Sequence, residues 1–184
     1  LDLGCGTGYF TSQLQAIFPE SRLVGLDIAS GMLAHARSHR KLGDEVSWVC
    51  GDAESLPLKS QSSSLVFSSL AIQWCENSTA LFSEISRVLQ FDGIACLATL
   101  GPKTLFELRE AWSKVDDYRH VNQFQPMQKL CEALPSDLEI LESESEMRVL
   151  HYSHLKELTH ELKGIGAHNM NAGQAKGLTG PARV

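Results

Sequence analysis

Residues 1–8 read Leu-Asp-Leu-Gly-Cys-Gly-Thr-Gly, a short apolar strand end followed by three glycines at alternate positions, Gly4, Gly6 and Gly8. Glycine at this spacing lets the backbone turn sharply and approach a ligand closely, with free N–H groups at the start of the next helix. The stretch predicts a cofactor-binding loop of the nucleotide type. Because a strand this short cannot stand alone, we also expect further residues upstream of Leu1.

The spacing of the glycines separates two classes of cofactor loop. A dinucleotide fingerprint is G-x-G-x-x-G, and counting from Gly4 its third glycine would fall on the large residue Tyr9. The observed pattern is G-x-G-x-G, and no Gly-Lys-Ser or Gly-Lys-Thr triphosphate motif is present. The loop therefore favours a ligand without a pyrophosphate, and an NAD enzyme is a poor alternative.

Composition places the chain among ordinary folded domains. Its 184 residues suffice for one domain with a substantial core, and 43% apolar with 21% charged residues is typical of globular proteins. The formal net charge of −6 argues against a nucleic-acid partner, and no apolar run approaches the ~20 residues of a membrane span. The five cysteines are scattered without a CxxC pair, so we expect no metal site, no disulfide framework and a reducing, cytoplasmic compartment.

Apolar runs alternate with segments of helical period through the first hundred residues. We expect strands at 1–3, 22–27, 46–50, 65–69 and 94–100, a turn at 92–93, and helices at 9–18, from Ser30 onward and at 78–89. This alternation predicts an α/β fold, a doubly wound and mostly parallel Rossmann-like sheet with helices on both faces. Ligands of such sheets bind beyond the carboxyl ends of the strands, where the glycine loop, Asp27, Asp52 and Ser69 fall.

The regular alternation of strand-like and helix-like segments ends at about residue 100. We expect helices at 104–115, 126–134 and 155–165, a long strand within 139–152 and a terminal loop. Residues 1–100 are predicted to form the cofactor-binding core, and residues 101–184 a helical and strand-containing substrate side of the same domain. Residues 151–184 carry four basic residues against two acidic ones on an otherwise acidic chain. That balance favours an acidic partner, although a solvated helix face is the simpler explanation.

Two acids at strand ends narrow the choice of ligand. Asp27 lies about 20 residues beyond the loop, where a carboxylate accepts hydrogen bonds from both ribose hydroxyls. Its other interpretation is a cap on the following helix. Asp52 could accept a hydrogen bond from the exocyclic amine of an adenine while Ala53 donates a backbone N–H, or it could simply organise its own turn.

The stretches LDLGCGTG, VGLD and GDAESLP are similar to the class I S-adenosylmethionine-dependent methyltransferases. The resemblance covers residues 1 to about 100. It implies that Gly4, Gly6 and Gly8 line the methionine part of S-adenosylmethionine. It also implies that Asp27 holds the ribose and that Asp52 with Ala53 holds the adenine. The remaining cofactor-binding residues that it implies are Ile28, Met32, Ser69 and Leu70, of which the last two would border the sulfonium and its amino group.

A narrower resemblance extends along the rest of the chain. LAIQWC at 70–75, ELREAW at 107–112, HVNQF at 120–124 and LKGIGA at 162–167 resemble the malonyl-acyl-carrier-protein O-methyltransferases of biotin synthesis. This resemblance implies methyl transfer from S-adenosylmethionine, with S-adenosylhomocysteine as product, to the free carboxylate of malonyl on acyl carrier protein. The methyl ester would prime synthesis of the pimeloyl chain. Members of the family extend further at both ends, so we expect a fold truncated at both ends.

A carboxylate is ionised at neutral pH, so the implied reaction needs no general base. Catalysis should come from alignment and from exclusion of water. The candidates for this work are Gln73, Trp74, His120, Asn122 and Lys163. Trp74 could instead be ordinary core, and a lone histidine is more often structural. Two other functions stay open: another methyltransferase of the same fold acting on a free carboxylic acid or a quinone, or a non-catalytic module that binds the cofactor.

Overall fold

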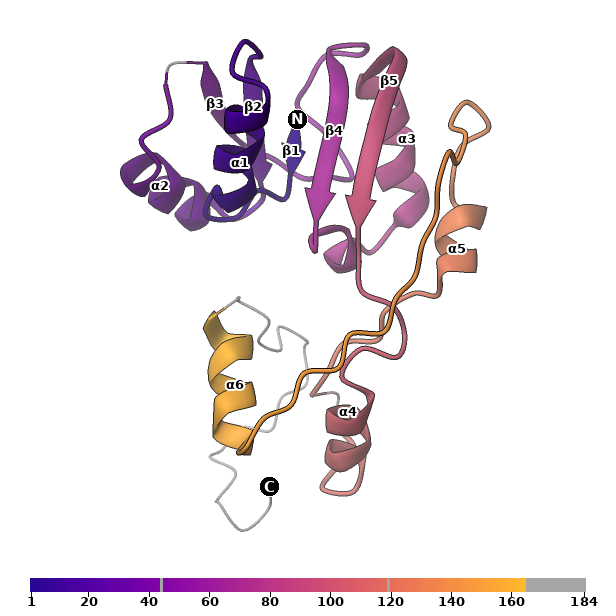
Figure 1. The fold of residues 1–184 in the computed structure, drawn as a ribbon. Helices are drawn as coiled ribbons and strands as arrows, with labels where there is room; N and C mark the ends of the chain where they lie inside the picture. The colour runs from indigo at the N-terminus through magenta and orange to yellow at the C-terminus, as the bar shows by residue number, and fades with distance from the viewer. Residues whose placement is uncertain (44, 119, 165–184) are drawn as a thin grey trace. The chain divides into compact units, whose positions relative to one another are not determined.

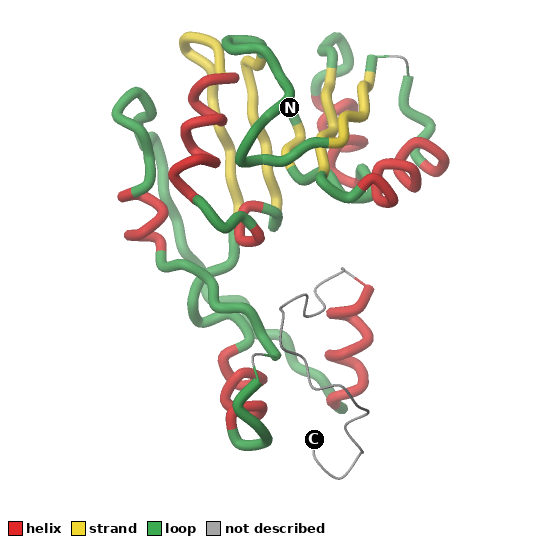
Figure 2. The backbone as a smooth tube through the Cα atoms, turned by 180° about the vertical axis from the view of Figure 1, so that it is seen from behind, coloured by secondary structure: helices red, strands yellow, loops and turns green. Residues whose placement is uncertain are grey.

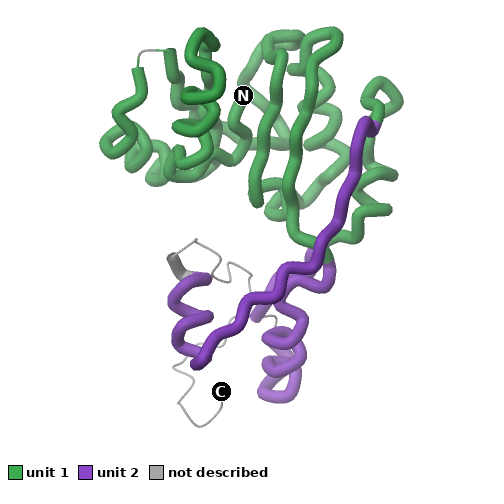
Figure 3. Tube along the Cα trace, viewed as in Figure 1, with its two compact units in different colours: residues 1–101, 125–139 green, residues 102–124, 140–184 purple. Residues whose placement is uncertain are grey.

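The computed structural model describes residues 1–43, 45–118 and 120–164. The chain divides into two compact units, which Figure 3 distinguishes by colour. Unit 1 comprises residues 1–101 and 125–139, and unit 2 comprises residues 102–124 and 140–184. The chain therefore leaves unit 1 at residue 101 and returns to it for a short segment after residue 124.

Unit 1 is built on a five-stranded sheet in the order β3-β2-β1-β4-β5 (Figure 1). Its strands are β1 (Asp2–Leu3), β2 (Leu23–Asp27), β3 (Val46–Cys50), β4 (Ser63–Ser69) and β5 (Leu89–Ala98). All four pairings are parallel. The chain builds the sheet outward from β1, first toward β3 and then toward β5, so the topological switch point lies between β1 and β4. The predicted doubly wound parallel sheet is confirmed.

The helices follow the apolar periodicity of the sequence. They are α1 (Tyr9–Ile17), α2 (Ser30–His39), α3 (Ser78–Val88), α4 (Phe106–Ser113), α5 (Met127–Glu132) and α6 (Leu155–Gly164), with a short 3-10 turn, η1 (Ile72–Trp74). Viewed from the two sides in Figures 1 and 2, α1 and α3 cover opposite faces of the sheet. This arrangement follows from right-handed crossovers that run in opposite directions from the central strand.

The core of unit 1 lies between α3 and the central strands. α3 buries Leu81, Phe82, Ile85 and Val88, which the helical period places on one side. They pack in one cluster with buried side chains of the strands that include Leu3, Leu26 and Val66. Burial of each large apolar side chain contributes roughly 1.5–3 kcal/mol. The packing fixes the strand ends from which the candidate site is built.

Two sequence predictions in these elements were wrong. The turn at residues 92–93 lies inside β5 rather than before it: Ser63 pairs with Leu89 and Leu65 with Ile94, so residues 90–93 form a bulge. The long strand expected within 139–152 is absent: residues 139–152, all of them described, have no regular secondary structure. Its apolar side chains are largely exposed (Leu141 77%, Val149 65%), so no face is buried against which the alternation could form a strand.

Within the described ranges, no helix has both the length and the apolar character that crossing a bilayer requires. The five cysteines are all free thiols, and Cys5 is the buried one among them.

Candidate functional site

The three glycines of the first loop have left-handed backbones, with φ of +73° at Gly4, +54° at Gly6 and +73° at Gly8. A Cβ at Gly4 would lie 2.1 Å from the Cβ of Ala71, and one at Gly8 would lie 2.5 Å from the ring of Trp48. These two glycines are therefore required by packing as well as by conformation. A Cβ at Gly6 would meet nothing within 4 Å, so it would project into open space.

The carboxylate of Asp27 holds the loop in place. Its Oδ2 accepts a hydrogen bond from the Gly6 N–H at 2.8 Å, and its Oδ1 accepts one from the Ala29 N–H, also at 2.8 Å. Ala29 is the N-cap residue of α2, so the second contact fixes the turn before the helix and does not cap the first helical N–H groups. A carboxylate offers about four acceptor positions, which leaves capacity for the hydroxyls of a ribose.

An arginine at the end of α2 braces the same loop. Arg40 follows the last residue of α2, and its Nε donates to the carbonyl oxygen of Thr7 at 3.0 Å. Its guanidinium also lies 5.8 Å from the ring centroid of Tyr9. Nothing in the local sequence marks this contact, because it joins residues 33 positions apart.

Asp2 is a second residue whose role emerged only in the structure. It is 2% exposed on β1 and accepts a hydrogen bond from Thr11 Oγ1 at 2.5 Å, which ties the strand to α1. Burial raises the pKa of the Asp2 carboxyl above its ordinary value. An acid inside an apolar strand end was the available signal for it.

The turn after β3 contains Asp52 and Ala53. Asp52 Oδ1 accepts a hydrogen bond from the Glu54 N–H at 2.9 Å. This carboxylate therefore organises its own turn, which was the alternative to adenine binding in the sequence analysis. The carboxylate keeps further acceptor capacity. Asp52 is exposed and Ala53 half-buried, at the carboxyl end of the strand adjoining β2.

The end of β4 and the segment after it carry four predicted residues: Ser69, Leu70, Gln73 and Trp74. Leu70 has a left-handed backbone (φ +52°), and its N–H donates to Ala98 O at 2.9 Å. Gln73 Nε2 donates to Leu70 O at 2.5 Å, and Gln73 Oε1 accepts from Thr99 Oγ1 at 3.4 Å. Gln73 thus braces the backbone beside β5. Trp74 is 44% exposed, so it is not ordinary core.

Large apolar side chains are exposed along this edge of the sheet. Those that the sequence reading assigned to cofactor binding are Ile28 (71% exposed), Met32 and Leu70. Together with the glycine loop and the carboxylates of Asp27 and Asp52, they provide apolar surface and hydrogen-bond acceptors at the strand ends. This combination suits a ligand that carries hydroxyls and positive charge, and it disfavours a pyrophosphate.

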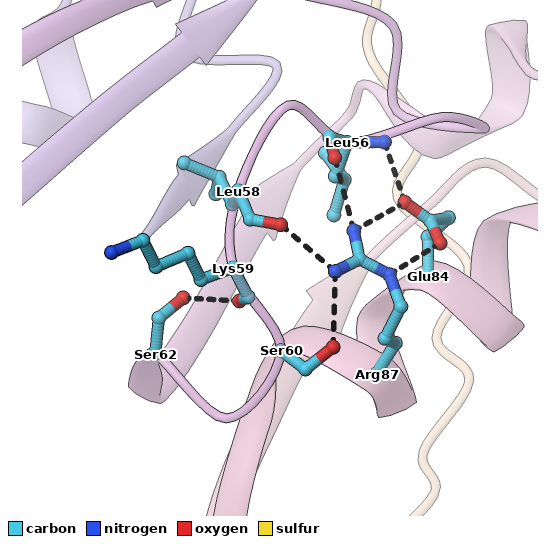
Figure 4. A network of polar contacts seen from close by, with 7 residues as sticks. All are labelled: Leu56, Leu58, Lys59, Ser60, Ser62, Glu84 and Arg87. Carbon is cyan, nitrogen blue, oxygen red and sulfur yellow. Dashed lines mark hydrogen bonds and ion pairs between the residues drawn. The ribbon is translucent and has the colours of Figure 1, made fainter.

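The loop at residues 56–60, which follows the turn of Asp52 and Ala53, is fixed to α3 by an ion pair (Figure 4). Glu84 and Arg87 form a two-point contact with both N···O distances at 2.7 Å. The Arg87 guanidinium also donates to the carbonyls of Leu56 (3.0 Å) and Leu58 (2.8 Å), while Glu84 Oε2 accepts from the Leu56 N–H at 2.6 Å. The hydrogen bond from Arg87 lowers the pKa of Glu84 below its ordinary value.

Unit 2 contains His120 in a pocket of about 290 Å³. Its ring stacks on Trp112 with centroids 3.8 Å apart, and His120 Nε2 lies 2.8 Å from Asp116 Oδ1. Arg109, Tyr118 and Gln123 also line the pocket.

Of the other predicted substrate residues, Asn122 is half-buried in the segment after His120. Lys163 lies in α6, but its side chain is outside the described residues, as is the Gly/Ile/Ala stretch from residue 165 onward. The predicted residues with described side chains therefore fall into two groups. The cofactor residues, Gln73 and Trp74 gather at one edge of unit 1, and His120 and Asn122 belong to unit 2.

A parallel sheet of this order, with a glycine loop after its central strand at the switch point, defines a domain that binds a nucleotide-type cofactor. The chain belongs to the methyltransferase-domain family, whose model ("Methyltransferase domain") matches residues 1–97.

Comparisons along the whole chain are more specific. The chain is 48% identical over 186 residues to the "Biotin biosynthesis bifunctional protein BioHC" of Cellvibrio japonicus, covering 100% of this chain and 36% of that protein. It is 41% identical over 184 residues to the "Malonyl-[acyl-carrier protein] O-methyltransferase" of Hahella chejuensis, covering 100% of this chain and 66% of that protein. The chain thus spans about a third of the first relative and just under two thirds of the second.

A solved structure is similar to part of this chain and carries a related name. An S-adenosylmethionine-dependent methyltransferase from Mesorhizobium loti is 32% identical with a TM-score of 0.51, over 55% of this chain and 46% of that one.

Proposed function

We propose that this chain is the methyl-transferring part of a malonyl-acyl-carrier-protein O-methyltransferase. It would move the methyl group of S-adenosylmethionine to the free carboxylate of a malonyl thioester on acyl carrier protein, in biotin synthesis. One observation carries the proposal: the identity of 41% to a relative of that name runs over the whole chain, including the residues beyond the family match at 1–97. The segment after residue 97 is where substrate choice would reside.

The strand-end site fits S-adenosylmethionine by its chemistry. Gly6 leaves open space beside the Asp27 carboxylate, and Asp27 has acceptor capacity for ribose hydroxyls. We assign Asp52 and Ala53 to the adenine, and Gly4, Gly8, Ser69 and Leu70 to the methionine part. The acids at these strand ends suit a ligand that carries both a sulfonium and an ammonium charge. Ile28 and Met32 supply the exposed apolar surface.

The bound cofactor supplies an electrophilic methyl group on a cationic sulfur. The acceptor is a carboxylate that is already ionised at neutral pH, so the protein needs to position it and exclude water. Trp74 offers a partly exposed apolar wall for this purpose. Gln73 shapes the backbone beneath that wall through Leu70 and Thr99.

We assign contact with the malonyl end to His120, Asn122 and Lys163. Asp116 and the Trp112 ring orient the His120 imidazole. Residues 1–100 then act as the cofactor core and residues 101–184 as the substrate side. The partner is the acidic acyl carrier protein, in the cytoplasm.

The test is the mass of the product. The chain is incubated with S-adenosylmethionine and malonyl-acyl carrier protein, and the carrier is analysed by intact mass spectrometry. We expect a gain of one methyl group on malonyl and none on acetyl-acyl carrier protein, which has no free carboxylate. Methylation of a free carboxylic acid or a quinone in place of malonyl would support the broader alternative. Binding of S-adenosylhomocysteine without any transfer would indicate a cofactor-binding module.

A further inference from the structure

Glu54 joins two segments that are well separated along the chain. Its Oε1 accepts hydrogen bonds from the backbone N–H of Glu76 at 2.6 Å and of Asn77 at 3.0 Å, 22 and 23 residues away. Its own N–H donates to Asp52 Oδ1 at 2.9 Å. One residue therefore connects the turn after β3 with the segment that follows η1.

The contact has the geometry of a carboxylate bound by consecutive backbone N–H groups. Two successive N–H groups point at one carboxylate oxygen, and charge-assisted bonds of this kind are shorter and stronger than neutral ones. Asn77 is the N-cap of α3, where its Oδ1 accepts from the Ala80 N–H at 3.0 Å. The start of that helix carries partial positive charge, which adds attraction for the Glu54 carboxylate.

A thiol adjoins this contact along the chain. Cys75 immediately precedes the two N–H donors and is half-buried. Burial, with smaller contributions from the Glu54 and Asp52 carboxylates, raises the pKa of the Cys75 thiol to about 11. The thiol therefore stays protonated at neutral pH and adds no charge beside the Glu54 and Asp52 carboxylates.

The two connected segments carry different parts of the proposed site. Asp52 and Ala53 lie on the cofactor side, whereas Gln73 and Trp74 lie on the side that faces the acceptor. We propose that Glu54 is a positioning residue, which holds segment 72–77 at a fixed distance from the turn at 51–55. This inference rests on the proposed methyl transfer, because it takes the first segment as the cofactor side and the second as the acceptor side. A misplacement of about 1 Å between reacting groups is enough to slow a reaction about 100-fold.

Three variants of the chain test this role. Glu54→Ala removes the acceptor of both N–H groups, whereas Glu54→Gln keeps a carbonyl oxygen in the same place. Glu84→Gln is the matched control, because Glu84 accepts the Leu56 N–H and fixes the same loop a few residues further on. We expect Glu54→Ala to lower kcat about tenfold while the Kd of S-adenosylhomocysteine changes less than about threefold. Glu54→Gln should recover most of the rate, and Glu84→Gln should lower Tm without lowering kcat.

Hydrogen exchange gives a readout that does not depend on the acceptor substrate. In the unaltered chain, S-adenosylhomocysteine should slow amide exchange across residues 72–77, and in Glu54→Ala that protection should be lost while binding persists. Protection by the ligand without any transfer to malonyl would contradict the proposed function and leave the connection intact. An unchanged kcat in Glu54→Ala, or an equal loss of rate in Glu84→Gln, would overturn the inference.

Discussion

Gly6 differs from the two glycines beside it in what surrounds it. Gly4 and Gly8 each face a side chain at less than van der Waals distance, from Ala71 and Trp48, so their lack of a Cβ serves packing. Gly6 faces open space, yet its N–H is bound to Asp27. A substitution at Gly6 therefore separates ligand binding from folding better than one at either neighbour.

We expect Gly6→Ala to weaken binding of S-adenosylhomocysteine at least about tenfold, because the added methyl enters the space assigned to the ligand. The left-handed backbone makes the same change cost about 1 kcal/mol of stability. Titration calorimetry and thermal unfolding measure the two effects. Gly31→Ala in α2 is the control: its Cβ also meets nothing, and we expect equal or higher stability with unchanged affinity. Equal affinities in the two variants would place the ligand elsewhere.

Residues that act through local backbone geometry could be predicted from the sequence. Left-handed glycines and acids at strand ends leave a spacing pattern, so the sharp turn of the loop and the position of Asp27 at a strand end could be predicted without a structure. Arg40 and Glu54 act through contacts 33 and 22 residues away, which no local pattern encodes. For the same reason the sequence could not predict the contacts of Gln73. Its side-chain amide forms hydrogen bonds with Leu70 and Thr99, and these depend on how β5 lies beside β4.

At the scale of elements, the spacing of apolar residues predicted the sheet and the helices. It did not predict the irregularity within β5 or the lack of a strand at 139–152. The bulge in β5 arises because residues 90–93 are inserted opposite a much shorter stretch of β4, a mismatch visible only once the strands are paired. The stretch 139–152 alternates as a strand would, but strand formation also needs a partner and a buried face. Helices depend less on distant partners, which is why all of the expected ones were found.

The Glu84–Arg87 pair is the element-scale contact that fixes the loop after β3 to α3. We expect Arg87→Met to lower the free energy of unfolding by about 1–2 kcal/mol at pH 7, after discounting for partial exposure. That corresponds to a fall in Tm of about 2–8 °C for a chain of this size. Arg22→Met is the control, because the Arg22–Glu45 pair is long, at 3.7 Å, with Arg22 92% exposed, and should contribute almost nothing.

The pH dependence of that effect has a definite sign. Arg87 lowers the folded-state pKa of Glu84 below its ordinary value of 4.5, so its stabilisation is fully present above that pH and is lost as the pH falls through the lowered pKa. Denaturant unfolding at pH 7 and at decreasing pH below 4.5 should show the deficit of Arg87→Met shrinking. It should not vanish, since the hydrogen bonds to Leu56 and Leu58 carbonyls do not titrate. A deficit independent of pH would contradict this account.

At the scale of the whole molecule, the two parts of the chain differ in which similarity to known proteins falls on them. Unit 1 holds the residues that we propose bind the cofactor, and it contains the family match at 1–97, a domain that many methyltransferases of different substrates share. Residues after 97 carry the part of the similarity to the named O-methyltransferases that lies outside this match, and in our proposal they choose the substrate. The division of roles between residues 1–100 and 101–184 stays a prediction. The sequence could not predict that residues 125–139 pack with unit 1, because this depends on tertiary contacts of Leu130, Leu134 and Leu138 with the core.

The charge distribution of the whole chain leads to a prediction about carrier binding. Residues 151–184 hold four basic residues against two acidic ones, while the chain as a whole has a net charge of −6. An acidic acyl carrier protein should therefore dock on this segment.

We expect Lys156→Glu combined with Lys176→Glu to raise the KM for malonyl-acyl carrier protein about tenfold at low salt, and less as the ionic strength rises. The KM for malonyl-coenzyme A, which lacks the carrier surface, should not change. The control Arg22→Glu with Lys59→Glu alters net charge equally but lies outside the segment, so it should leave both KM values unchanged; an equal effect of the two double variants would exclude 151–184 as the docking surface.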